Sequence, residues 1–198
     1  LLAERGLMPF IDLAYEGFSR GLVEDAGMVR AFAAAGLSFF VASSFSKNMA
    51  MYGGRTGAIH AVCADADEAA RVKSQLARTV RSLYSNAPFQ GATIAATILT
   101  DPELRAGWEE EVTTMRTRIT DMRAALLAAL VAAGVEDMGF ITRQAGMFSF
   151  PGLSRDEMIR LREEYHVYGL DTGRICMAAL NSRNVEYVAS AIAAVHRG

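Results

Sequence analysis

The residue with the clearest chemical potential is Lys47, one of only two lysines in the chain of 198 residues. It follows an apolar, strand-like run and lies among hydroxyl side chains, with Ser44 and Ser46 just before it and Arg55 beyond a glycine pair. A lysine that is shielded from water is partly neutral, and a neutral amine can form a Schiff base with a carbonyl compound. Two hydroxyls and a planar guanidinium suit a phosphate dianion. The alternative is a solvated lysine in a surface turn.

A second group of side chains favours the chemical interpretation. Asp12 comes at the end of an earlier strand-like run, and Tyr15 follows three residues later. A carboxylate at a strand end can hold a proton on a heteroaromatic nitrogen, and a phenol can donate to an oxygen on the same ring. With a Schiff-base lysine and a phosphate pocket, these are the groups that pyridoxal phosphate requires.

Several motifs in a fixed order carry a resemblance to a known family. They are Asp-x-Ala-Tyr-x-Gly-Phe at 12–18, Ser-Ser-Phe-Ser-Lys-Asn at 43–48, Tyr-x-x-Arg-x-Gly at 52–57, Arg-x-x-Tyr-Ser-Asn-x-Pro at 81–88, Gly-Met-Phe-Ser-Phe at 146–150 and Gly-Arg at 173–174. Through nearly all of its length the chain resembles the C-terminal portion of the class I aminotransferases of fold type I. Within that family it is similar to the aspartate and aromatic amino-acid aminotransferases.

The resemblance implies a role in cofactor binding for each residue named above. Lys47 would form the Schiff base with pyridoxal 5'-phosphate and then move the proton between the substrate Cα and the cofactor. Asp12 would keep the pyridine nitrogen protonated. Tyr15, a catalytic residue together with Lys47, would hydrogen-bond the ring hydroxyl oxygen. The phosphate would be held by Ser44, Ser46 and Arg55.

The resemblance also implies three substrate-binding residues and a homodimer. Arg174 would bind the α-carboxylate of the amino acid through two parallel hydrogen bonds, and Phe148 would line the substrate pocket. Arg81 would reach into the active site of the neighbouring subunit and pair with the distal carboxylate of the substrate. Without the family, a solvated arginine and a core phenylalanine are the simpler interpretations of Arg81 and Phe148.

Alternating apolar strands and helices must position these residues. Buried strands are predicted at 8–14, 37–42 and 57–64, and helices at 22–36 and 65–83. This alternation predicts an α/β fold with a covered sheet. The resemblance identifies the fold as part of the large domain of fold type I, with an incomplete, mostly parallel sheet, followed by an α+β small domain.

The second half of the chain begins with a long predicted helix over 101–133, whose apolar residues recur at steps of three and four. We predict strands at 140–142, at 147–150, through Tyr168 and at 174–178. The box Ser154-Arg155-Asp156-Glu157 starts one helix, and a final helix begins near Arg183. The predicted domains are 1–115, the C-terminal part of the cofactor-binding domain, and 116–198, the small domain. The helix over 101–133 bridges them.

Composition excludes several classes of function. The net charge is −2 and the arginines are scattered, so no basic stripe indicates a nucleic acid or membrane partner. No transmembrane-length run or signal peptide is found, and we expect a cytoplasmic protein. The two cysteines and three histidines lack ligand spacing, so we expect no metal site and attribute structural roles to Cys63, Cys176, His60, His166 and His196.

The resemblance also shows what this stretch lacks, because the family builds part of its cofactor pocket from an earlier half of the chain. We therefore expect these residues to be a C-terminal portion that is catalytically inactive alone. The expected activity of the whole enzyme is transfer of an amino group between tyrosine, phenylalanine or aspartate and 2-oxoglutarate. The preference between aromatic and dicarboxylic substrates stays open. The alternative is an aminotransferase-like, ligand-sensing domain of a transcription regulator.

Overall fold

The computed structural model describes residues 1–2 and 4–196, and the chain forms two compact units. The N-terminal unit contains residues 1–17 and 21–112, and the C-terminal unit contains residues 18–20 and 113–198. Ala3, Arg197 and Gly198, which fall in the two predicted domains, lie outside the described residues. Identifying the two units with domains of a cofactor-dependent enzyme remains a prediction.

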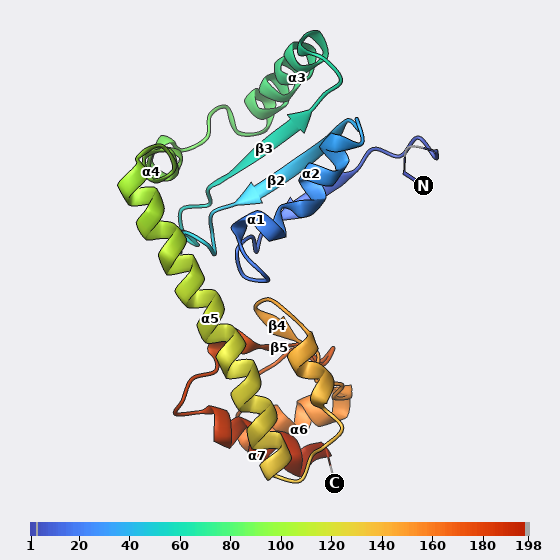
Figure 1. Ribbon diagram of the computed structural model, residues 1–198, viewed down its shortest axis with the longest axis vertical. Helices are drawn as coiled ribbons and strands as arrows, with labels where there is room; N and C mark the ends of the chain where they lie inside the picture. The colour runs from blue at the N-terminus through green and yellow to red at the C-terminus, as the bar shows by residue number, and fades with distance from the viewer. Residues whose placement is uncertain (3, 197–198) are drawn as a thin grey trace. The chain divides into compact units, whose positions relative to one another are not determined.

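A three-stranded sheet forms the centre of the N-terminal unit (Figure 1). Its strands are β1 (Phe10–Leu13), β2 (Phe39–Ser44) and β3 (Gly57–Val62), in the order β1-β2-β3. β1 pairs with β2 in parallel, whereas β2 and β3 are antiparallel. The α/β class is therefore confirmed, but the described sheet is mixed rather than mostly parallel. The long connection over residues 45–56 lets the chain reverse without the short turn signature of a tight hairpin.

Helices flank this sheet in the N-terminal unit. The predicted helix 22–36 is divided into α1 (Leu22–Asp25) and α2 (Gly27–Ala34), and the turn that ends it is completed by Gly36 at a φ of +68°. α2 packs on Ile11, Phe39 and Val41 of the sheet, with the Phe32 ring edge-on to Phe39 at 5.8 Å. α3 (Ala66–Tyr84) follows β3, and α4 (Phe89–Thr100) is a helix that the sequence patterns did not predict. Asp65 caps α3 by accepting the Glu68 N–H.

The long helix α5 runs over Pro102–Ala132, close to the predicted 101–133. Its start is capped by the Asp101 carboxylate, which accepts the N–H groups of Glu103 and Leu104. Ile119, Leu126 and Leu130 on its apolar face are buried in the core of the C-terminal unit. Across the described part of the chain, no helix is both long and apolar enough to span a lipid bilayer.

The C-terminal unit packs α5 against two further helices and a two-stranded sheet. Its other elements are the 3-10 helix η1 (Gly139–Arg143), β4 (Phe148–Ser149), α6 (Arg155–Tyr165), β5 (Ile175–Cys176), the 3-10 helix η2 (Met177–Ala179) and α7 (Val185–His196). β4 and β5 pair antiparallel, and Phe18 joins the core of this unit. The capping box that starts α6 is present as predicted.

Two predicted strands of this unit are wrong, because neither segment has a pairing strand among the described elements. Residues 140–142 belong to η1, which buries Ile141 completely and leaves Thr142 exposed. Tyr168 is 74% exposed in a stretch without regular structure. An apolar or β-branched triplet therefore does not make a strand without a partner.

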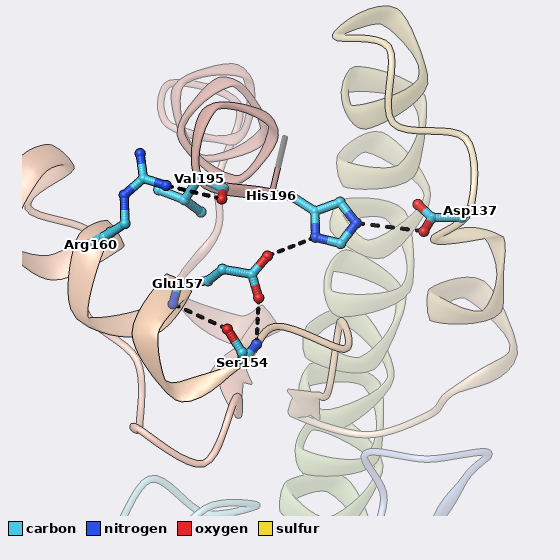
Figure 2. Close-up of polar contacts among 6 residues, drawn as sticks. All are labelled: Asp137, Ser154, Glu157, Arg160, Val195 and His196. Carbon is cyan, nitrogen blue, oxygen red and sulfur yellow. Dashed lines mark hydrogen bonds and ion pairs between the residues drawn. The ribbon is translucent and has the colours of Figure 1, made fainter. Parts of the chain in front are cut away.

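A polar cluster ties the end of α7 to two other segments of the C-terminal unit (Figure 2). His196 Nδ1 lies 2.9 Å from Glu157 Oε1, and His196 Nε2 lies 3.5 Å from Asp137 Oδ2. The hydrogen bond with Glu157 raises the pKa of His196, and the Asp137 carboxylate adds to the effect. Burial opposes ionisation of Glu157, but its hydrogen bonds with Ser154 and His196 lower its pKa. The neighbouring Arg160 donates to the Val195 carbonyl.

The His196 cluster predicts a pH-dependent stability. A raised pKa means that the stabilisation is complete below the ordinary histidine pKa and is lost as pH rises through the folded-state value. The free energy of unfolding of the chain, measured by urea denaturation from pH 6 upwards, should therefore fall in the wild type. His196→Gln should remove this pH dependence of the free energy of unfolding. His60→Gln, at an exposed position on β3, should keep it. Identical slopes in all three proteins would contradict the prediction.

The register of β2 and β3 predicts the effects of two glycine substitutions. Gly57 is paired with Ser44, and a Cβ on Gly57 would lie 2.5 Å from the main-chain oxygen of Ser43, which cannot swing away. Gly57→Ala should therefore reduce the free energy of unfolding by about 1–3 kcal/mol, as overpacking does. Gly53→Ala is the control, because a Cβ there meets nothing within 4 Å. Equal stability of the two variants in urea denaturation would show that the register can relax.

Candidate active site

The predicted cofactor-binding residues gather at one edge of the sheet in the N-terminal unit. Parallel pairing of β1 with β2 places Leu13 beside Ser43, so the carboxyl ends of both strands meet at this edge. Because β3 is antiparallel, its first residue Gly57 lies at the same edge, opposite Ser44. The edge at the carboxyl ends of parallel strands is where α/β proteins bind ligands. The residues delivered there are Asp12, Tyr15, Ser44, Ser46, Lys47 and Arg55.

Lys47 lies directly against Tyr15. Its Nζ is 4.5 Å from the centroid of the tyrosine ring, and its side chain is half-buried. An ammonium group at that distance is attracted by the ring face. The structure thus brings together the two residues for which the sequence predicted a catalytic role, from segments that follow β1 and β2.

The loop that carries Lys47 is anchored by a contact that the sequence patterns did not reveal. Trp108 of α5 donates its indole N–H to the Asn48 carbonyl at 2.7 Å. Asn48 is itself buried, and its Oδ1 has no hydrogen-bond partner among the described residues. The main chain next to Lys47 is therefore fixed, and an unsatisfied acceptor lies beside it.

The two serines are close together, but the guanidinium of Arg55 is engaged elsewhere. Ser46 is 4% exposed, and its N–H donates to Ser44 Oγ at 3.2 Å. Arg55 is exposed and donates from Nη1 to the Tyr52 carbonyl at 3.3 Å. Arg55 also has a φ of +48°, a strained conformation for a residue with a Cβ. The predicted phosphate-binding set is therefore only partly assembled in this structure.

The turn after β1 contains a carboxylate that the sequence patterns did not single out. Burial raises the pKa of Glu16, and the nearby charge of Asp25 raises it further. Asp25 Oδ2 also accepts the Gly17 N–H at 2.9 Å, which ties the turn to the end of α1. Asp12 itself is exposed at the end of β1. These contacts hold the segment that presents Asp12 and Tyr15.

Arg81 lies away from this group of contacts, in the last turn of α3. Its Nη1 donates to Ser85 Oγ at 2.7 Å, and the side chain is exposed. Large apolar side chains near it are exposed too, with Leu83 at 73%, Tyr84 at 56% and Phe89 at 82%. The structure therefore gives Arg81 a surface position in the N-terminal unit.

The two remaining predicted residues form a pair in the C-terminal unit. Arg174 Cζ lies 4.4 Å from the centroid of the Phe148 ring, because β4 and β5 pair with Phe148 opposite Cys176. Both side chains are half-buried. Within the described range no acidic side chain forms an ion pair with Arg174, so its planar fork is available for a carboxylate ligand.

The donor set of the N-terminal unit suits an organic cofactor better than a metal. No group of three or more His, Cys, Asp and Glu side chains that could hold a metal ion occurs among residues 1–2 and 4–196. A half-buried amine, a phenol and a carboxylate instead surround one sheet edge, with two hydroxyls beside them. These groups fit a compound that carries a carbonyl, a heteroaromatic ring and a phosphate.

Comparison with known proteins identifies the family. Residues 1–192 match the family described as aminotransferase class I and II. The aspartate aminotransferase of Pseudomonas aeruginosa is 50% identical over 196 residues, covering 98% of this chain and 49% of that protein. The aromatic-amino-acid aminotransferase of Escherichia coli is 47% identical, with the same two coverages. The chain thus spans about half the length of the curated relatives it matches.

Solved structures agree with this result. An aromatic-amino-acid aminotransferase from Burkholderia pseudomallei, covalently bound to pyridoxal phosphate, has a TM-score of 0.95 and 52% identity, covering 98% of this chain and 49% of that one. The cytoplasmic aspartate aminotransferase of Saccharomyces cerevisiae has a TM-score of 0.94 and 41% identity, covering 99% and 50%. The chain belongs to the class I and II aminotransferases.

Proposed function

We propose that this chain forms part of an aminotransferase that uses pyridoxal phosphate and acts on aspartate or aromatic amino acids. The observation that carries the proposal is the position of Lys47 Nζ, 4.5 Å from the Tyr15 ring at the sheet edge where Asp12, Ser44 and Ser46 also lie. The names of the relatives at 45–50% identity, aspartate, tyrosine and aromatic-amino-acid aminotransferases, support this substrate class.

When bound, pyridoxal phosphate supplies a ring that accepts electrons from the substrate Cα. In the proposed site Lys47 would hold the cofactor, and its amine would take the proton from the substrate Cα. Asp12 would keep the proton on the ring nitrogen, and the Tyr15 hydroxyl would donate to the ring oxygen. Ser44, Ser46 and Arg55 would bind the phosphate, and Arg55 would have to leave the Tyr52 carbonyl to do so.

We propose that substrate recognition uses Arg174, Phe148 and Arg81. Arg174 binds the α-carboxylate with the Phe148 ring beside it, which fits the open guanidinium fork described above. Arg81 serves a homodimer by acting in the active site of the other subunit. Its exposed position, next to the exposed Leu83 and Tyr84, supports an interface at this surface.

The chain alone is proposed to be inactive. It spans about half the length of its relatives. In addition, the Arg55 guanidinium is bound to the Tyr52 carbonyl and does not join Ser44 and Ser46 in the described structure. The cytoplasmic location stays a prediction. The ligand-sensing domain of a transcription regulator remains the alternative.

Borohydride reduction can test the role of Lys47, because this chain has only one other lysine, Lys73, which is exposed on α3. We expect a chimera, in which this chain replaces the half it matches in the P. aeruginosa relative, to become yellow with pyridoxal phosphate. Reduction should bleach the colour and mark Lys47 in peptide mass spectra. Lys47→Ala should lose both signals and Lys73→Ala should keep both. The chain alone should give no stable colour, so a yellow product there would refute its proposed inactivity.

Substrate kinetics in the same chimera test the arginines. Arg174→Ala should lower kcat/KM for both aspartate and phenylalanine, by an amount that corresponds to about 2–5 kcal/mol for a lost charged partner. Arg81→Ala should lower it mainly for aspartate, since only that substrate has a distal carboxylate. Arg155→Lys, an exposed variant in the ion pair with Asp171, is the control. Loss confined to one substrate in Arg174→Ala would contradict the α-carboxylate role.

A further inference from the structure

Arg123 is a buried charge with an unusual set of partners. Its side chain is 3% exposed inside the C-terminal unit, on the same helix that supplies the apolar core residues. No ion pair with an acidic side chain involves it among the described residues. Burial lowers its pKa. A buried guanidinium of this kind must be stabilised by hydrogen bonds to polar groups.

The partners of Arg123 are three main-chain carbonyls that precede or belong to β4. Nη2 donates to Gly146 O at 2.7 Å and to Phe148 O at 3.1 Å, and Nη1 donates to Ile141 O at 3.3 Å. One planar group therefore fixes two points of the segment 146–148 relative to η1. Lysine could not do the same, because its donors radiate from a single nitrogen.

The two residues that follow Phe148 are held by hydrogen bonds as well. Gln144 donates to Phe150 O at 3.0 Å and accepts the Phe150 N–H at 3.0 Å through Oε1. The same Oε1 accepts the Ser149 hydroxyl at 2.6 Å. The main chain is thus held at Gly146 and Phe148 by Arg123 and at Phe150 by Gln144.

The ring of Phe148 is the surface on which the Arg174 guanidinium lies, 4.4 Å from its centroid. An arginine side chain has several rotatable bonds, and ordering it costs free energy that a preorganised surface reduces. The chain of contacts therefore runs from Arg123 through the 146–148 main chain and the Phe148 ring to Arg174.

We propose that Arg123 is a positioning residue for the carboxylate-binding Arg174: by fixing the main chain of residues 146–148 it fixes the Phe148 ring against which the guanidinium lies. This role rests on the proposed function, since it presupposes that Arg174 binds the substrate carboxylate. The packing relation between Arg123, Phe148 and Arg174 can nevertheless be tested without any activity.

The first test is nuclear magnetic resonance of the arginine side chains in the full chain. Protons of Arg174 near the Phe148 ring face should be shifted upfield by the ring current, and Phe148→Leu should abolish that shift. Arg123→Met should reduce it strongly. Arg123→Lys, which keeps the charge and most of the stem, should reduce it less and serves if the methionine variant does not fold.

The matched control is Arg118→Met. Arg118 is on the same helix and also donates to two carbonyls, Leu180 O and Ala178 O, both at 2.8 Å. Its removal should leave the Arg174 signal unchanged. An Arg174 signal that is unchanged in both Arg123 variants, or that is equally altered in Arg118→Met, would overturn the proposal.

The second test is a double-mutant cycle in the chimera described above. Arg123→Met should lower kcat/KM for amino acids on the order of tenfold to a hundredfold, mostly through KM, as expected for a binding group displaced by about 1 Å. In an Arg174→Ala background it should cause no further loss. Equal losses in both backgrounds would reveal general destabilisation and overturn the proposal. If the wild-type chimera showed no transaminase activity, that result would contradict the proposed function instead. The magnetic resonance test would still decide the role of Arg123.

Discussion

The parallel pairing of β1 with β2 is the constraint on which the N-terminal unit depends. Parallel neighbours point the same way, so whatever follows each strand emerges at the same edge of the sheet. Tyr15 lies in the segment after β1 and Lys47 in the segment after β2. Lys47 Nζ is 4.5 Å from the centroid of the Tyr15 ring. A slip of one residue between β1 and β2 would put the buried Ile11 and Val41 on opposite faces of the sheet, so that only one of them could pack against α2. The apolar core therefore enforces the register that assembles the site.

The C-terminal unit reaches a comparable result with very little sheet. β4 and β5 are two residues each, too short to define the position of a side chain by strand pairing alone. Polar side chains that bind main-chain atoms supply the missing constraint, as Gln144 does around Phe150. Hydrogen bonds from side chains to the main chain suit a short segment, because each of them fixes a particular peptide group rather than a whole strand.

Much of the candidate site could be predicted from the sequence, because its residues follow apolar strands with recognisable periods. Sequence patterns put Asp12 near the end of its strand and Tyr15 and Lys47 after theirs, and the capping box of Ser154 marked the start of α6. The contact of Trp108 with Asn48 joins residues 60 positions apart, and no local pattern carries such information. The orientation of Arg55 depends on its own positive φ and on its hydrogen bond to the Tyr52 carbonyl, and neither can be read from the sequence. The strand predicted at 140–142 failed for a related reason, since strand formation depends on a distant partner.

Phe18 has a consequence for how the chain can be divided. It is 4% exposed in the core of the C-terminal unit, while residues on both sides of the 18–20 segment belong to the N-terminal unit. The polypeptide therefore passes between the units at 17/18, at 20/21 and at 112/113. A single proteolytic cut after residue 112 would leave two pieces still held by the buried Phe18 ring. A C-terminal unit expressed separately from residue 113 onwards would lack the Phe18 ring, which would leave a hole in its core.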